Sequence, residues 1–222
     1  MGGLDFSQLD WSEFGAATLD TLKMVGASAL FTLILGLPLG IILFMSARST
    51  TPWIKGVYSV LSFIVNILRS VPFVILIVAL LPITDILVGT TIGVLGTIPP
   101  LVIAAAPFFA RLVETALREV DRGVLEAASA MGASVWQIIT RVLVREALPG
   151  LLAGLTVTVV ALVSNTAMAG MIGAGGLGTL AVNYGYYRYE TAVMLVAVVI
   201  MVIIVQVLQM IGDRLVIYFS RK

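Results

Sequence analysis

The chain has 222 residues, of which 60% are hydrophobic and 11% are charged, and its mean hydropathy is +1.12. Soluble domains carry about 25% charged residues, so this composition is typical of an integral membrane protein. The sequence contains no cysteine and no histidine, which excludes a disulfide framework, a His/Cys metal site and catalysis by a serine–histidine pair. The formal net charge of +1 does not indicate nucleic-acid binding, and we expect no metal and no nucleic acid as ligands.

Five apolar segments are each long enough to cross a bilayer, which takes about 20 residues of helix. Helices are expected because lipid cannot satisfy free backbone groups and the segments are too long for barrel strands. In chain order, we expect spans at about 24–45, 60–81, 92–112, 151–172 and 191–211. The sequence therefore predicts an all-α integral membrane protein with a single transmembrane domain over residues 1–222.

The basic residues predict how these spans are oriented. With the N-terminus outside, one basic residue, Arg188, falls on the outer side, and ten of the thirteen fall on the cytoplasmic side. These ten are Arg48, Lys55, Arg111, Arg118, Arg122, Arg141, Arg145, Arg214, Arg221 and Lys222. Because cytoplasmic loops are enriched in Lys and Arg, we expect a periplasmic N-terminus and a cytoplasmic C-terminus.

The loop at about 118–149, between the third and fourth spans, then lies in the cytoplasm. Its first half is rich in small residues, which let the backbone of a partner approach closely, and Gly132 can adopt positive φ and end one short helix before the next. The second half has an apolar face at helical spacing, formed by Trp136, Ile138, Ile139, Val142 and Leu143. This pattern is equally compatible with a docking surface and with an ordinary interfacial loop helix.

The order Glu126-Ala-Ala, three residues and Gly132 resembles the EAA loop in the membrane subunits of ATP-binding-cassette (ABC) importers. In that family, nine residues follow the glycine, and Ile-x-Leu-Pro comes after them. Here the Leu-Pro position holds Val144-Arg145, and Leu148-Pro149 comes four residues later. The resemblance implies a type I ABC importer permease whose coupling helix sits in a groove of a cytoplasmic ATPase. The implied coupling residues are Glu126, Ala127, Ala128, Gly132 and Trp136, with Glu126 as the polar anchor and Gly132 as the turn.

The resemblance extends over nearly the whole chain, to the permeases of the methionine importers, which carry D- and L-methionine. The similar segments are Asn66-Ile-Leu-Arg-Ser-Val-Pro-Phe73, Ala106-Pro-Phe-Phe-Ala-Arg111, Arg145-Glu-Ala-Leu-Pro-Gly150 and Gly173-Ala-Gly-Gly-Leu-Gly178. It implies an inner-membrane subunit served by a periplasmic or lipid-anchored substrate-binding protein. Because neighbouring permeases share some of these segments, another amino acid or small polar solute is an alternative substrate.

The chain has no nucleotide site of its own, so we do not expect it to be an enzyme. The glycine run Gly170–Gly178 lacks the Lys-Ser/Thr ending of a phosphate-binding loop. The implied ATPase dimer would bind ATP and Mg, and this chain would bind no cofactor. Five helices do not readily enclose a path for an amino acid, whereas a homodimer forms one along its two-fold axis. An ATP-independent channel is the alternative from another class.

Five residues inside the predicted spans are candidates for the translocation path or gate: Asn66, Arg69, Ser164, Asn165 and Met168. A central arginine costs roughly 2.5–3.5 kcal/mol on insertion scales, so Arg69 should face protein, water or the interface. We favour a structural pairing of Arg69 over substrate contact, with snorkelling to the headgroups as the alternative. Asn66 shares its helix face, and the polar patch of the fourth span should face a path or a partner rather than lipid.

Two further patterns concern the second and third spans. Pro72, Pro99, Pro100 and Pro107 interrupt them, which is equally compatible with a kinked lining of the path and with passive packing. The helical spacing of Arg111, Glu114 and Arg118 permits ion pairs. We interpret these three residues as a solvated helix end.

Overall fold

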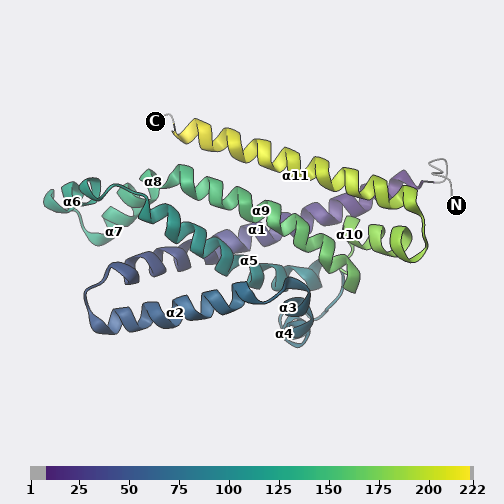
Figure 1. Cartoon of the computed structure of the whole chain (residues 1–222), viewed down its shortest axis with the longest axis horizontal. Coiled ribbons are helices and arrows are strands. Elements are labelled where there is room, and N and C mark those ends of the chain that lie inside the picture. Colours follow the sequence, from purple (N-terminus) through teal and green to yellow (C-terminus); the bar gives the residue numbers. More distant parts are fainter. Residues whose placement is uncertain (1–8, 221–222) are drawn as a thin grey trace.

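The computed structural model describes residues 9–220, and every regular element in that range is a helix (Figure 1). Four helical segments within it are long and apolar enough to cross a membrane: α1 (Trp11–Arg48), α5 (Gly93–Arg118), α9 (Leu148–Ala169) with its 3-10 extension η2 (Gly170–Ile172), and α11 (Thr191–Ser220). A fifth candidate span is the bent pair α2 (Pro52–Ser70) and α3 (Phe73–Ala79). The predicted all-α membrane fold is confirmed.

Shorter elements connect these helices. They are α4 (Leu81–Val88), α6 (Arg122–Ala130), α7 (Val135–Gln137), the π-helix η1 (Ile138–Leu143), α8 (Val144–Glu146), α10 (Gly176–Leu180) and the π-helix η3 (Ala181–Tyr187). The long helices run side by side along the long axis of the molecule, and α6 and α7 extend beyond them at one end (Figure 1). We call this the loop end. The last turn of α11 lies at the loop end and the first turn of α1 lies at the opposite end, as an odd number of crossings requires.

The helices are longer than the predicted apolar segments. The first helix begins at Trp11 rather than near residue 24, because the Asp10 side chain accepts hydrogen bonds from the backbone N–H groups of Ser12 and Glu13. Such an N-cap satisfies donors that the first helical turn leaves free. The last helix likewise continues to Ser220. Arg221 and Lys222, which entered the charge count, lie outside the described residues.

The second span is not the single helix expected over 60–81. The chain bends by 105° between α2 and α3, where Val71 adopts an extended conformation with φ −77° and ψ 125°. Pro72 causes this break, because proline lacks an N–H and pushes the preceding residue out of the helical region. In the third span, by contrast, Pro99, Pro100 and Pro107 lie inside the continuous helix α5, so the chain does not break there.

Small residues allow α1 and α5 to pack closely. A Cβ atom on Gly40 would lie 2.5 Å from the Cβ of Val113 and 2.6 Å from the carbonyl oxygen of Ala110, and a Cβ on Gly36 would lie 2.9 Å from the Phe109 ring. The Gly-xxx-Gly spacing thus brings the two backbones together, as it does in other membrane helix pairs. This contact fixes α1 against the helix that leads directly into α6.

Candidate functional site

The segment from α6 to α7 forms a compact turn at the loop end. Asp121 caps α6 by accepting a 2.6 Å hydrogen bond from the backbone N–H of Gly123. The helix ends at Ala130, and Gly132 has φ +78°. The backbone N–H of Ala133 closes the turn by donating to the carbonyl oxygen of Ala128 at 3.2 Å. The predicted role of Gly132 as a turn between two short helices is confirmed.

The second short helix starts with a capping box that the sequence pattern Ser-x-x-Gln encodes. The backbone N–H of Gln137 donates to the Ser134 hydroxyl oxygen at 3.3 Å, and the backbone N–H of Ser134 donates to the Gln137 side-chain oxygen at 2.8 Å. From Ile138 onward the chain forms the π-helix η1 rather than the expected α-helix. The apolar face is therefore only partly as predicted, since Leu143 is buried while Trp136 is 72% exposed.

Exposure divides the predicted coupling residues into two groups. Glu126, Ala127 and Gly132 are exposed together with Trp136, whereas Ala128 is 4% exposed and packs inward. Ala128 is therefore not available to a partner, and its small size instead lets α6 lie against η1. Met131 is 82% exposed, so it adds to an apolar patch on a segment that projects beyond the helices. An exposed apolar patch of this kind is typical of a protein-interaction site.

The displaced Leu-Pro pair has a structural role at the end of this loop. Pro149 occupies the first turn of α9, directly after α8. Proline is favoured there because the first helical N–H groups have no partner inside the helix. The departure from the family pattern thus places the proline at the start of the fourth span.

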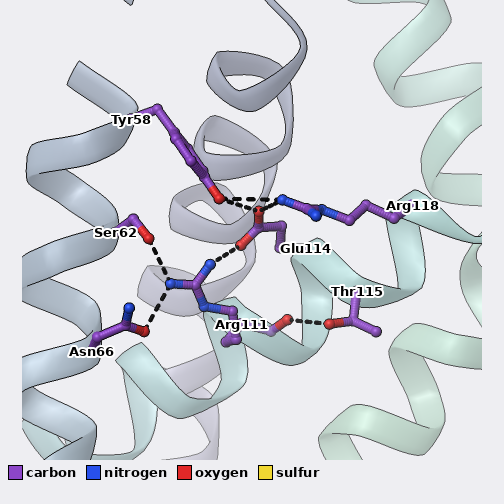
Figure 2. Close-up of polar contacts among 7 residues, drawn as sticks. All are labelled: Tyr58, Ser62, Asn66, Arg111, Glu114, Thr115 and Arg118. Atoms are coloured by element: carbon purple, nitrogen blue, oxygen red, sulfur yellow. Dashed lines mark hydrogen bonds and ion pairs between the residues drawn. The ribbon is translucent and has the colours of Figure 1, made fainter. Parts of the chain in front are cut away.

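A buried carboxylate ties α5 to α2 next to the loop end (Figure 2). Glu114 is 1% exposed and accepts hydrogen bonds from Nη1 of Arg111 at 2.6 Å and from Nη2 of Arg118 at 2.5 Å. The hydroxyl of Tyr58 on α2 donates to the same carboxylate at 3.3 Å. The predicted ion pairs are confirmed. The interpretation as a solvated helix end fits Arg118, whose side chain is 54% exposed at the end of α5, and is wrong for Glu114, which is buried and bonded to Tyr58 of α2.

The same network reaches further along α2. Nη2 of Arg111 donates to the hydroxyl oxygen of Ser62 at 2.8 Å and to the side-chain oxygen of Asn66 at 2.9 Å (Figure 2). Asn66, expected on the translocation path, is thus held by α5. We call Tyr58, Ser62, Asn66, Arg111, Glu114 and Arg118 the α2–α5 network. Sequence reasoning missed the contribution of α2, because its partners on α5 are 45 to 60 residues away.

A cavity of about 180 Å³ lies where α2 breaks, between the middle parts of α5 and α9. Its lining residues are Leu68, Arg69, Val71, Phe73, Ala104, Ala105, Phe108, Thr158, Ala161, Leu162 and Asn165. The structure therefore brings Arg69 and Asn165 together. Ser164 and Met168 are not among the lining residues and lie exposed on α9.

The expected structural pairing of Arg69 takes an unexpected form. Its guanidinium carbon lies 5.6 Å from the centre of the Phe108 ring, a cation–π contact. Within residues 9–220, no ion pair joins Arg69 to an acidic side chain. Arg69 is exposed toward the cavity rather than enclosed by a counter-charge.

A bundle of long apolar helices with one broken span is typical of membrane transport proteins, in which broken helices are buried or line a cavity. The sequence profile described as binding-protein-dependent transport system inner membrane component matches residues 36–222. The chain belongs to this family and is an inner-membrane protein of the permease class. The prediction that it is not itself an enzyme is confirmed by the same relationship.

Individual relatives within this family are similar in sequence over about three quarters of the chain. The chain is 49% identical over 165 residues to the methionine import system permease protein MetP of Bacillus subtilis. The aligned region covers 74% of this chain and 74% of that protein. It is 45% identical over 160 residues to the probable D-methionine transport system permease protein MetI of Pasteurella multocida, covering 72% of this chain and 74% of that protein.

Solved structures agree with the fold. A crystal form of the inward-facing MetNI methionine ABC transporter matches with a TM-score of 0.89 and 43% identity, covering 94% of this chain and 96% of that one. An amino acid ABC transporter crystallised with histidines matches with a TM-score of 0.74 at 19% identity, covering 96% of this chain and 95% of that one. The second likeness concerns the fold alone. The type I ABC importer permease architecture expected from the sequence is therefore confirmed.

Proposed function

We propose that this chain is the translocating subunit of an ATP-driven methionine importer. The observation that carries the proposal is its identity of 45–49% to permeases named for methionine transport, together with the exposed turn around Gly132. Two copies would form the path along a two-fold axis, and a cytoplasmic ATPase dimer would bind ATP and Mg. A periplasmic or lipid-anchored binding protein would deliver the substrate to the opposite face and supply most of the affinity.

The loop end is proposed to face the cytoplasm. Elements at that end carry Arg48, Lys55, Arg118, Arg122, Arg141, Arg145 and Arg214, whereas Arg188 lies between η3 and α11. This asymmetry supports a cytoplasmic loop end under the positive-inside rule. A cytoplasmic ATPase can then reach the patch formed by Met131 and Trp136.

The α2–α5 network offers a route by which the ATPase moves the path. When the ATPase pair closes on ATP, α6 would shift, and α5 would follow because only three residues separate Arg118 from Arg122. Glu114 and Arg111 would carry this movement to α2. The far end of α2 forms one wall of the cavity, so closure of the motor would reshape the path.

The path itself is proposed to follow the cavity and the adjoining face of α9. Arg69 and Asn165 line the cavity. Ser164 and Met168 are exposed in the single chain and would face the path or the second copy. Polar and flexible side chains at such positions avoid contact with lipid.

Reconstitution tests the proposal. The purified permease, its ATPase and its binding protein are placed in liposomes, and uptake of labelled methionine is measured with and without ATP. The proposal predicts uptake only with ATP, reduced by unlabelled methionine. Flux without ATP would establish a channel, and competition by a different amino acid or small polar solute, but not by methionine, would establish an importer for that solute.

A further inference from the structure

Arg69 differs from the other arginines that meet α5. Arg111 and Arg118 both bind the Glu114 carboxylate. Arg69 makes a cation–π contact with the Phe108 ring and, among the residues described, forms no ion pair with an acidic side chain. A cation at membrane depth is costly and marks a functional site when it faces a cavity. The guanidinium of Arg69 therefore has room and hydrogen-bond donors for an anion that the chain does not itself provide.

The chemistry of the cavity narrows the kind of anion. Besides Arg69, its polar side chains are Thr158 and Asn165, and the remaining lining residues are apolar. The Thr158 side chain is 1% exposed and its hydroxyl already donates to the carbonyl oxygen of Gly154 at 2.8 Å, so Arg69 and Asn165 are the polar groups of the lining that a ligand can reach. A guanidinium binds a carboxylate through two parallel hydrogen bonds. The amide of Asn165 can accept from an ammonium group, and the half-buried side chains of Phe73 and Ala161 provide an apolar surface.

We propose that Arg69 binds the carboxylate of the permeating amino acid, so that the permease itself distinguishes α-amino acids from otherwise similar solutes that lack a carboxylate. This inference rests on the proposed function, because it assigns the cavity to the translocation path. The apolar wall would receive the substrate side chain.

Binding at this site is transient. The volume of about 180 Å³ is below the roughly 300–1,000 Å³ of sites that enclose a drug-sized ligand. A path must also release what it binds, which requires weak contacts. Asn66, three residues before Arg69, is held by Arg111, so the same helix end that meets the carboxylate is coupled to the loop end.

The absence of cysteine permits a direct experiment on the assembled importer. The Ala104→Cys substitution places one thiol on the cavity wall, and its rate of modification by a small methanethiosulfonate reagent is measured in the liposome-reconstituted complex. Methionine is compared with methioninol, which has an alcohol in place of the carboxylate. The inference predicts that millimolar methionine slows modification at least threefold and that methioninol has no such effect.

Variants at Arg69 complete the test. Arg69→Gln and Arg69→Lys are combined with Ala104→Cys. Protection by methionine should be lost with Gln and weakened with Lys, because Lys lacks the two-pronged geometry of a guanidinium. Arg188→Gln is the matched control, since Arg188 also stacks on a ring, that of Tyr184 at 4.4 Å, but does not line the cavity. It should leave protection unchanged.

The outcomes separate this inference from the proposed function. Equal protection by methioninol and methionine would overturn the inference. This comparison keeps Arg69 intact, so it does not depend on whether an Arg69 variant folds. Full protection in Arg69→Gln would overturn it too. If the complex imports methionine with ATP but the thiol is never protected, the carboxylate site is wrong and the importer stands. If no ATPase associates and no uptake occurs, the proposed function fails.

Discussion

Arg111 on α5 and Asn66 on α2 are joined by a 2.9 Å hydrogen bond between the guanidinium and the side-chain oxygen (Figure 2). The same guanidinium contacts the buried carboxylate of Glu114 at 2.6 Å. The bond therefore links the helix that leads into the coupling turn with the helix that ends at the cavity. It gives the two candidate sites, otherwise distant in sequence, a physical connection.

Removing the charge of Glu114 should destabilise the protein strongly. Glu114→Gln takes the carboxylate away from Arg111, whose side chain is 20% exposed, and from Arg118, whose side chain is 54% exposed and open to solvent. Breaking a fully buried ion pair costs about 3–5 kcal/mol, so the cost here should lie toward the lower end of that range. We expect a clear fall in the apparent Tm of the purified complex. Asp20→Asn is the control, because the Asp20–Lys23 pair at 3.1 Å is exposed on both sides and should be worth less than about 1 kcal/mol. Equal Tm shifts for both variants would contradict the assigned role of Glu114.

The coupling turn could be predicted because the residues that form it are neighbours in the sequence. The burial of Glu114 and the cavity could not, because they depend on residues far apart in the sequence. Gly132 and the apolar spans could be read from neighbouring residues, whereas Pro72 alone did not separate a broken second span from a continuous one. The burial of Glu114 could not be predicted, because it depends on Tyr58, which is 56 residues away. The cavity likewise needs α2, α3, α5 and α9 together.

The continuity of α5 shows a second limit of sequence reasoning. Three prolines left a kinked lining and passive packing equally compatible with the sequence of the third span, and α5 is one helix from Gly93 to Arg118. Pro100 and Pro107 are buried against neighbouring helices, and packing of this kind can compensate for lost backbone hydrogen bonds in a membrane helix. Proline alone therefore does not decide whether a span breaks.

The turn at Gly132 should be sensitive to the residue that replaces it. With φ +78°, an ordinary side chain is strained by about 1–2 kcal/mol, whereas Asn tolerates the left-handed region better. Gly132→Leu should lose ATPase co-purification and ATP-dependent uptake, and Gly132→Asn should retain a larger share of both. The docking role of the turn would be wrong if the Leu variant assembled and transported normally.

Two glycines of α1 should respond in opposite ways to alanine. No atom lies within 4 Å of the position that an added methyl group would take at Gly26, so Gly26→Ala should stabilise the helix by up to about 1 kcal/mol. Gly40→Ala would place its Cβ 2.5 Å from that of Val113, and overpacking costs about 1–3 kcal/mol. Apparent Tm values should therefore rise for the first variant and fall for the second. A fall of the same size in both would show that the close α1–α5 contact is not the cause.

Thr21 should anchor the segment that follows α9. Its hydroxyl oxygen accepts a buried 2.9 Å hydrogen bond from the backbone N–H of Leu177, and Thr21→Val leaves that N–H unpaired at a cost of about 1–3 kcal/mol. Thr115→Val is the control, because Thr115 is exposed and its hydroxyl donates only within its own helix. Hydrogen exchange at Leu177 should accelerate in the first variant and not in the second; unchanged exchange in both would rule out the anchor.

The central claim is that the turn after α6 lies in the cytoplasm and is covered there by an ATPase. Ala130 is exposed at the end of α6, and the chain has no native cysteine, so Ala130→Cys provides a single reporter for a membrane-impermeant thiol reagent. Modification should occur in inverted membrane vesicles and not in right-side-out vesicles, and it should slow when the ATPase is bound. Modification from the outer side, unaffected by the ATPase, would contradict the account.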